Sequence, residues 1–492
     1  MSPRSLSHGV LFAALAAFTL AGTLAAQSLS PEKQTALEVV DQLSSEIHLM
    51  AMTLWDYSET AMLEAQSAEF LAALLEQEGF TVERGVAEMP TAFLASWGSG
   101  SPVIGVLAEF DALPGVGNAA VPRRQEREDG ISSGQGCGHN LFGAGSVGAA
   151  IALKRTMQSH DLKGTVKLFG TPAEETVVGK VYMAKAGVFD DLDATLDWHP
   201  GQETGVHNQP GRALNNFTVE FFGQAAHGAS DPWNGRSALD AVEMMNYAVN
   251  MMREHIRPSA RIHYVIPSGG DAPNVVPEYA KVWYYVREAD REKVEEYYNW
   301  ILNIAQAAAL ATRTEHKVTL ITGVHEMNLN RPLQVAMQKN LEALGPPEFS
   351  DDYEQFAKDL QRSLDLEEKG LETEIKELAD EPEPVSGGST DVAEVSHINP
   401  TVSLRVTSAA ADVPWHSWAT SASHGTEGSI VAAAFAAKVL ALTGVDMLTD
   451  PELMAEAKEY FLEKTGGKAY VSPIPIDQKP PVPVAEAGNE DR

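Results

Sequence analysis

Five side chains of the types that bind transition metals lie far apart along this chain: Cys137, His139, Glu175, His199 and His416. A thiolate, neutral imidazoles and a carboxylate suit borderline divalent ions such as zinc, manganese or cobalt. Cys137 and His139 are separated by a single glycine, so both side chains can point the same way from an extended backbone. Each residue alone is more often a core or surface residue than a ligand. A metal site is therefore predicted only if all five converge.

Two adjacent glutamates, Glu174 and Glu175, add acid–base chemistry to this set. In a turn their side chains can diverge, one toward a metal and the other toward a water molecule. A metal lowers the pKa of its bound water, and a neighbouring carboxylate can then take the proton as general base. Asp111 is a further candidate, placed to orient a ligand or the water. The alternative for the glutamate pair is a solvated acidic turn.

Short buried strands are predicted to deliver these residues. Apolar runs at 103–107, 165–169 and 194–198 are followed by Asp111, by the glutamate pair and by His199. A fourth strand at 401–406 precedes the loop with His416, and the glycine-rich turn at 132–145 leads into a helix. Strands that alternate with helices predict an α/β fold, a mostly parallel sheet with helices on both faces. Ligands bind at the carboxyl ends of such strands.

The pattern changes between residues 212 and 327, which predicts an inserted domain. The order is strand, helix, strand, strand, helix, strand, at 213–222, 237–256, 260–267, 279–287, 291–312 and 317–323. This βαββαβ order is that of a ferredoxin-like unit. The main domain then comprises residues 27–211 and 328–468. A proline-rich tail at 469–492 is expected to be unstructured or draped on the surface.

The N-terminal segment and the net charge of the chain indicate its cellular location and exclude some classes of partner. Arg4, the apolar run 10–21 and the small residues that follow predict a signal peptide at 1–26, so the protein is expected to be exported, in a bacterium to the periplasm. The protein is expected to be soluble after the signal is cleaved, without a stable membrane anchor; the alternative is that the N-terminal segment is retained as an anchor. The apolar segment 429–447 contains charges and is predicted as a buried core helix. A net charge of −32 argues against nucleic acid as a partner.

Several sequence runs together resemble a known family. They are LAEFDALPG, GCGHNLFGAG, TPAEE, DWHP, GQAAHGA, APNVVP and HSW, between about Pro31 and Lys464. In this order they resemble the amidohydrolase branch of the metal-dependent aminoacylase and carboxypeptidase family, and within it the p-aminobenzoyl-glutamate hydrolase group. The resemblance implies a zinc-carboxypeptidase-like catalytic domain and a dimerisation role for the insert. It also implies hydrolysis of an N-acyl or aminobenzoyl amino acid or a dipeptide.

The resemblance implies a role for each site residue. Cys137, His139, Glu175, His199 and His416 would hold two divalent ions, zinc or manganese, with Cys137 at a bridging position. Glu174 would be the general base and Asp111 a supporting carboxylate. Glu109 stands where other branches have a metal-binding histidine. His227 would stabilise the oxyanion in a neighbouring subunit's site.

Partners follow from the same resemblance. Asn274 and Arg287 would contact a small amide substrate that carries a carboxylate. The alternatives are a turn residue for Asn274 and a surface salt bridge for Arg287. The chain would form a homodimer or a hetero-oligomer with a related subunit. Two other interpretations remain open: a hydrolase with Cys137 as nucleophile, and a non-catalytic partner subunit.

Overall fold

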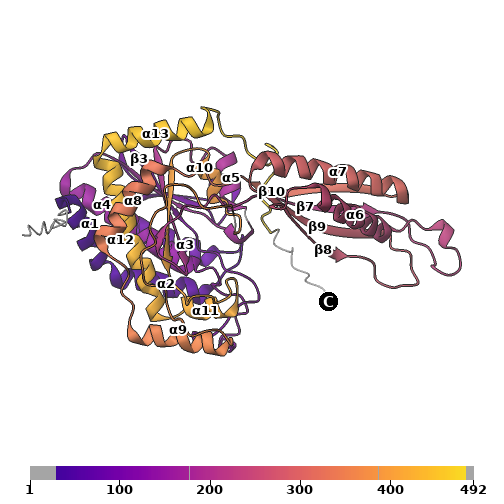
Figure 1. Ribbon diagram of the computed structural model, residues 1–492, viewed down its shortest axis with the longest axis horizontal. Helices are drawn as coiled ribbons and strands as arrows, with labels where there is room; N and C mark the ends of the chain where they lie inside the picture. The colour runs from indigo at the N-terminus through magenta and orange to yellow at the C-terminus, as the bar shows by residue number, and fades with distance from the viewer. Residues whose placement is uncertain (1–28, 177, 386, 484–492) are drawn as a thin grey trace, which may run out of the picture.

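The computed structural model describes residues 29–176, 178–385 and 387–483. A globular body carries an elongated arm that projects from one side (Figure 1). The predicted signal peptide at 1–26 and the last residues of the predicted tail lie outside the described residues. Export therefore stays a prediction.

The body is built on a seven-stranded sheet in the order β1-β2-β4-β3-β5-β11-β6. The four central strands are parallel, and antiparallel strands complete both edges. The predicted α/β class is confirmed, although the sequence did not predict the edge strands. The strands are β1 Thr81–Arg84, β2 Phe93–Ser99, β3 Val103–Ala108, β4 Gly164–Gly170, β5 Ala194–Gly201, β6 Gly205–Val206 and β11 Thr401–Thr407.

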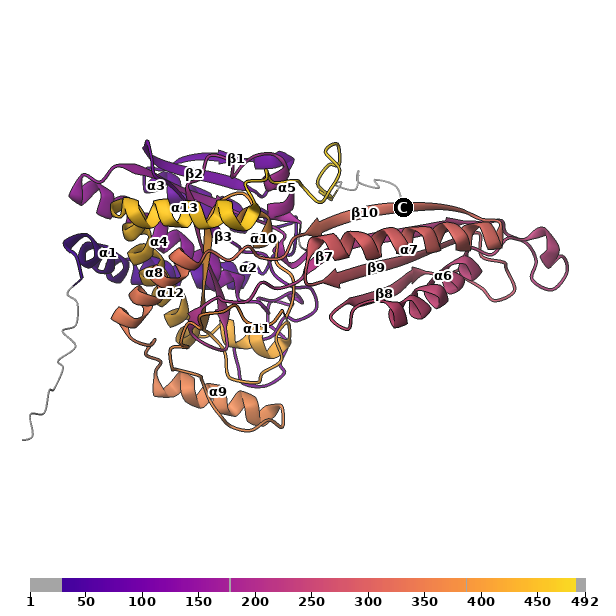
Figure 2. The same ribbon diagram turned by 45° about the horizontal axis from the view of Figure 1, so that its top comes forward.

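Helices flank this sheet (Figures 1 and 2). The two longest helices of the body, α4 and α12, pack against each other and against the central strands, and α1 and α2 pack on them. The helices of the body are α1 Pro31–Gln42, α2 Ser44–Tyr57, α3 Ala65–Gln77, α4 His139–His160, α5 Gly179–Lys185, α8 Arg331–Leu344, α9 Asp351–Ser363, α10 Val392–Ser396, α11 Trp418–His424, α12 Ile430–Thr449 and α13 Pro451–Thr465.

Helix α12 corresponds to the apolar segment 429–447, which was predicted as a buried core helix. It belongs to the one helix of the described chain that is long and apolar enough to span a bilayer. Most of its side chains are buried against neighbouring elements, as expected of a core helix. Gly145 of α4 allows the close approach, because a Cβ there would lie 2.8 Å from the Ala433 carbonyl oxygen.

The arm is the predicted ferredoxin-like insertion. It consists of β7 Ala213–Phe222, α6 Ala238–Met252, β8 Arg261–Ser268, β9 Tyr279–Glu288, α7 Arg291–Thr312 and β10 Glu315–Val324. Its sheet has the order β10-β7-β9-β8, and every neighbouring pair is antiparallel. Both helices contribute to a separate core with the buried side chains of β7 and β9. The arm is therefore a folding unit with its own apolar interior.

The acidic segment after residue 351 and the proline-rich tail after residue 469 both contact the rest of the protein. The acidic stretch after residue 351 is helical only to Ser363, and the chain beyond it is irregular and returns to the body. In the tail, Ile474 is buried in the main core. The Gln478 amide donates to the Tyr182 hydroxyl and to backbone carbonyls of β10. The described part of the tail therefore ties the arm to the body.

Candidate active site

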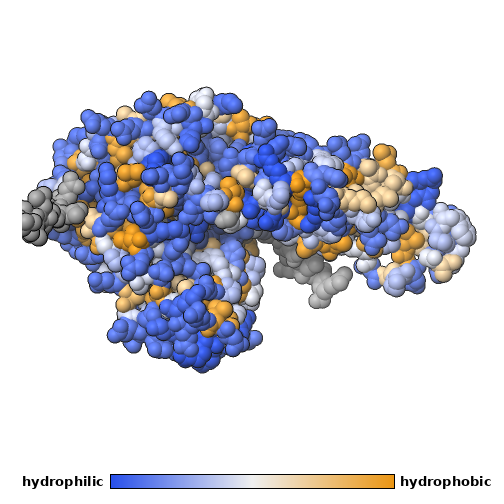
Figure 3. Space-filling model, in the orientation of Figure 1, coloured by the Kyte–Doolittle hydropathy of each residue, from blue (hydrophilic) through white to orange (hydrophobic). Residues whose placement is uncertain are grey.

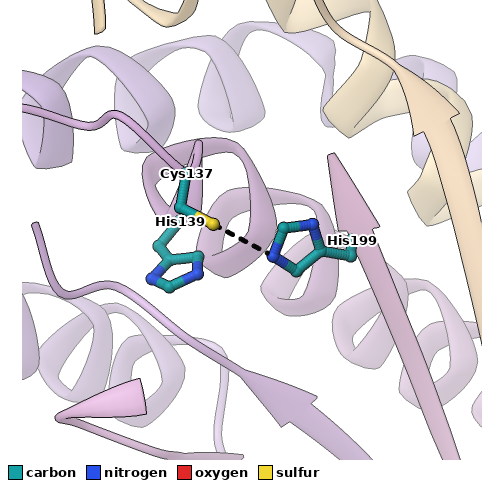
Figure 4. A group of neighbouring side chains, drawn as sticks. All are labelled: Cys137, His139 and His199. Carbon is teal, nitrogen blue, oxygen red and sulfur yellow. Dashed lines mark hydrogen bonds between the residues drawn. The ribbon is translucent and has the colours of Figure 1, made fainter. Parts of the chain in front are cut away.

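Four elements bring the five predicted ligand side chains together. Cys137 lies in the turn before α4, and His139 is the first residue of that helix. His199 lies within β5, which extends beyond the predicted strand to Gly201. Glu175 follows β4 in the short 3-10 turn Glu174–Thr176, and His416 lies in the loop before α11. Figure 4 shows Cys137, His139 and His199 facing one another.

The thiol of Cys137 lies at the centre of this cluster. Its Sγ is 3.4 Å from His199 Nε2 and accepts a hydrogen bond of 3.3 Å from the indole of Trp415. His199 Nδ1 lies 2.6 Å from the carbonyl oxygen of Pro200, so this nitrogen carries the proton. The lone pair of His199 Nε2 therefore points toward Cys137 and is available to a metal or a proton.

Asp111 connects the two sides of the cluster. Its Oδ1 is 2.9 Å from His139 Nδ1, and its Oδ2 accepts a 3.0 Å hydrogen bond from the backbone N–H of Glu175. This places Asp111 behind the predicted ligands, as a carboxylate that fixes their orientation. His139 Nε2, on the other side of the ring, is buried without a hydrogen bond. Carboxylate oxygens of Glu109 and Glu174 lie 3.1 and 3.8 Å from it.

The two adjacent glutamates diverge. Glu175 groups with Cys137 and His416, whose Nε2 is 3.5 Å from Glu175 Oε2, whereas Glu174 groups with Glu109 and His139. Cys137, His139 and His199 form a third group, and within each group the ligand atoms all lie within 4.8 Å of one another. Glu175 Oε1 is buried without a hydrogen bond. The cluster therefore offers several overlapping sets of metal-binding atoms.

Burial determines the protonation of these groups. It raises the pKa of Glu174 well above its usual range, helped by the charge of Glu109. It also raises the pKa of Glu175 to about 8 and that of the Cys137 thiol to about 12. Divalent cations would displace the protons from these buried carboxyl and thiol groups and bind the lone pairs that are freed. The donor set of one thiol, three imidazoles and buried carboxylates fits a centre for two divalent ions.

Lys180 is a part of the site that the sequence analysis missed. Its Nζ lies 2.7 Å from Glu109 Oε1 and 2.7 Å from Asp391 Oδ1, and all three side chains are fully buried. Burial disfavours a charged lysine, but the charges of Asp391 and Glu109 outweigh it and raise the pKa of Lys180. A lysine inside the apolar run VVGKVYMA was the available signal. Lys180 holds Glu109 next to His139.

The cluster opens into a cavity of about 650 Å³ between the body and the arm. Arg287 of β9 lies in its wall, and its role as a substrate contact stays a prediction. Arg405 of β11, His207 and Lys376 line the same cavity, and none of them was predicted from the sequence. Among these, His207 and Arg405 pair with each other through a 3.1 Å hydrogen bond.

His227 and Asn274 are not brought to this cavity. Both are exposed, and the Gly228 backbone N–H donates to the Asn274 carbonyl oxygen at 2.8 Å. The loop of His227 follows β7 and that of Asn274 follows β8, at the end of the arm away from the body. Within one chain they cannot reach the cluster, so a role for them requires a second subunit.

Comparison with known proteins identifies the family. The sequence model of peptidase family M20/M25/M40 matches residues 105–412, more than half of the chain. The chain belongs to this family. The family assignment made from the sequence runs is thereby confirmed, together with the class of enzyme, a peptidase or amidohydrolase.

Curated relatives from this family align over nearly the full length. The chain is 35% identical over 478 residues to one of the p-aminobenzoyl-glutamate hydrolase subunits of Escherichia coli (strain K12), covering 92% of this chain and 97% of the relative. It is 27% identical over 463 residues to the Xaa-Arg dipeptidase of Homo sapiens, covering 90% and 94%. Family M20 membership therefore extends across both the body and the arm.

Solved structures support the fold. A Bacillus subtilis protein described as a dinuclear metal-binding peptidase of family M20 superposes with a TM-score of 0.53 at 18% identity, covering 81% of this chain and 99% of that one. A putative aminohydrolase from methicillin-resistant Staphylococcus aureus superposes with a TM-score of 0.63 at 19% identity, covering 85% and 100%. The carboxypeptidase-like body with its inserted arm is shared with these proteins.

Proposed function

We propose that this M20 protein hydrolyses the amide bond of an N-acyl or aminobenzoyl amino acid or of a dipeptide. Cys137, His139, Glu175, His199 and His416 hold two divalent ions, zinc or manganese. The observation that carries the proposal is the convergence of these five side chains, with His139 Nε2 and Glu175 Oε1 buried and without hydrogen bonds. When bound, the ions polarise the scissile carbonyl and acidify a water molecule.

Glu174 acts as the general base in this proposal. Glu174 lines the cavity, and its side chain is 11% exposed. It does not belong to the neighbouring group of metal-binding atoms formed by Cys137, Glu175 and His416. Its carboxylate, ionised once the cations are bound beside it, would take a proton from the attacking water and return it to the leaving amine. Asp111 keeps His139 and the turn of Glu175 in place while the proton moves.

A second candidate function is hydrolysis by a Cys137 nucleophile. The 3.4 Å contact between Cys137 Sγ and His199 Nε2 favours it, because a nucleophilic cysteine needs a base within reach. The electrostatics oppose it. Burial raises the pKa of Cys137 and lowers that of His199 well below its usual range, so a thiolate–imidazolium pair is disfavoured. A metal-bound thiolate fits this environment better.

Removing and restoring the metal separates the two candidates. We expect dialysis against a chelator to abolish hydrolysis of a panel of N-acetyl amino acids, dipeptides and p-aminobenzoyl-glutamate. Added manganese or zinc should restore turnover, because the ions supply the Lewis acid. The measurement is turnover together with the metal content per chain. Full activity in the chelated protein, lost only on alkylation of Cys137, would establish the nucleophile instead.

We also propose that the protein self-associates, or binds a related protein, through the arm. Helix α6 exposes Met244, Tyr247 and Met251 on one face, and the adjacent edge strand β8 exposes Val265 and Ile266. Apolar patches are also visible along the arm in Figure 3. An apolar helix face beside an unpaired strand edge is typical of an interface. Two of the relatives are named as different subunits of one hydrolase, which is compatible with either arrangement.

Charges placed on the α6 face should weaken this association. We expect the double substitution Tyr247→Glu and Met251→Glu to convert an oligomer of the purified chain to monomer, because charged side chains would lose hydration in the interface. Light scattering measures the mass in solution. Leu310→Glu, at an exposed position of α7, is the matched control and should leave the mass unchanged. A wild-type chain that is monomeric at all concentrations, in the absence of a related protein, would contradict self-association.

A further inference from the structure

Among the described residues, two arginines in the cavity wall have no acidic partner. Arg405 and Arg287 both line the cavity that holds the metal-binding cluster. Within the described chain, no carboxylate oxygen lies within 4.0 Å of either guanidinium. The third cation of the wall, Lys376, is in contrast paired with Glu203 at 3.0 Å and with Glu383 at 2.8 Å. In a chain with 68 acidic and 36 basic side chains, unpaired arginines at the site indicate that an anion binds there.

The position of Arg405 connects it directly to the cluster. Strands β11 and β5 are parallel neighbours, and Arg405 is in register with His199. Adjacent strands are about 4.8 Å apart, and residues in register point to the same face. Both side chains line the cavity. Arg405 Nε donates to His207 Nδ1 at 3.1 Å, which leaves the terminal nitrogens of the guanidinium available to a ligand.

Arg287 approaches the cavity from the arm. It follows Tyr285 by two residues on the face of β9 that looks away from the arm's core, and its guanidinium lies 5.4 Å from the Tyr285 ring centroid. Its Nε is buried without a hydrogen bond. The hydroxyl of Ser389, also in the cavity wall, is likewise buried and unbonded. These groups are donors that a bound carboxylate would satisfy.

We propose that the cavity selects amides of acidic amino acids, with Arg405 binding the side-chain carboxylate of the substrate and Arg287 binding the other carboxylate. This inference rests on the proposed amide hydrolysis and adds its substrate class. Two unpaired guanidiniums match the two negative charges of an N-acyl glutamate or aspartate. They would repel a leaving amino acid with a cationic side chain, such as the arginine in the name of the dipeptidase relative. Arg405 is thus a specificity-determining residue.

A matched pair of substrates tests Arg405. We expect the metal-loaded wild-type protein to hydrolyse p-aminobenzoyl-glutamate with a kcat/KM about 10- to 100-fold above that for p-aminobenzoyl-glutamine, which lacks only the side-chain charge. Arg405→Gln should remove this preference, mainly through KM for the glutamate substrate, and leave the glutamine substrate nearly unchanged. Arg405→Lys should keep part of the preference, because it retains the charge without the two-pronged geometry. Arg331→Gln, at a position outside the cavity wall, should keep all of it.

The outcomes distinguish the substrate class from the reaction. If the wild-type protein hydrolyses the glutamine substrate or a dipeptide ending in arginine as well as the glutamate substrate, the selection for acidic amino acids is overturned while amide hydrolysis stands. An Arg405→Gln variant with an unchanged preference overturns the role of Arg405. If no substrate of the panel is hydrolysed by metal-loaded protein, the proposed function itself fails.

Discussion

Replacing Glu174 with glutamine is expected to lower kcat by about 10²- to 10⁴-fold while the metal content per chain stays the same. The amide keeps the size of the side chain but cannot take a proton. Glu174 groups with Glu109 and His139 and stays apart from Glu175, Cys137 and His416, so its loss should leave those predicted ligands in place. The measurements are steady-state kinetics and metal analysis on the same preparation.

The matched control changes a second glutamate of the same cavity. Glu203→Gln removes a carboxylate that pairs with Lys376 and is half exposed. Because Lys376 keeps Glu383 as a partner, this variant should retain kcat. A Glu174→Gln variant that retains kcat would refute the general base. One that loses metal along with activity would instead assign Glu174 to the metal-binding set with Glu109 and His139.

Several positions of the metal-binding cluster could be predicted because these residues follow predicted buried strands in the sequence. His199 and the glutamate pair come at the carboxyl-terminal end of apolar runs that could only be buried strands, and parallel strands bring their ends to one edge. The order of elements in the arm was also predictable, since its strands and helices each show a clear periodicity of their own. The edge strands β1 and β2 were missed because they are partly exposed and contain Gly98 and polar residues.

The missed residues depend on contacts between distant segments. Lys180 is stable as a buried cation only because Asp391, 211 residues away, and Glu109 neutralise it. Arg405 acquires its role from the register of β11 against β5, which no local pattern of residues encodes. The loops of His227 and Asn274 meet at the tip of the arm, so any role for these residues at the cluster would need a second subunit. Sequence periodicity therefore predicts the helices and strands and the sheet edge at which the site residues lie. The ion-pair and strand-register partners of a residue can be identified only in the folded chain.

Removal of the buried charge of Lys180 should have the largest effect on stability. Lys180→Met leaves Glu109 and Asp391 buried without their cation, although the methionine occupies a similar volume. Breaking a buried ion pair by deleting one partner costs about 3–5 kcal/mol. Burial already raises the pKa of Asp391 to about 6, so protonation of this carboxylate will recover part of the loss at acidic pH. Chemical denaturation of metal-free protein, followed by tryptophan fluorescence, measures the change in unfolding free energy.

A substitution of the surface residue Lys163 is the control for Lys180→Met. Lys163 pairs with Asp161 at 2.8 Å, but its side chain is 79% exposed, so Lys163→Met makes the same chemical change where water screens the charges. Its denaturation midpoint should match that of the wild type. Adding Asp391→Asn to Lys180→Met should restore part of the stability, because one of the two unpaired carboxylates is gone. Equal stability of Lys180→Met and the wild type at neutral pH would mean that Asp391 is protonated there and that Lys180 does not stabilise it as an anion.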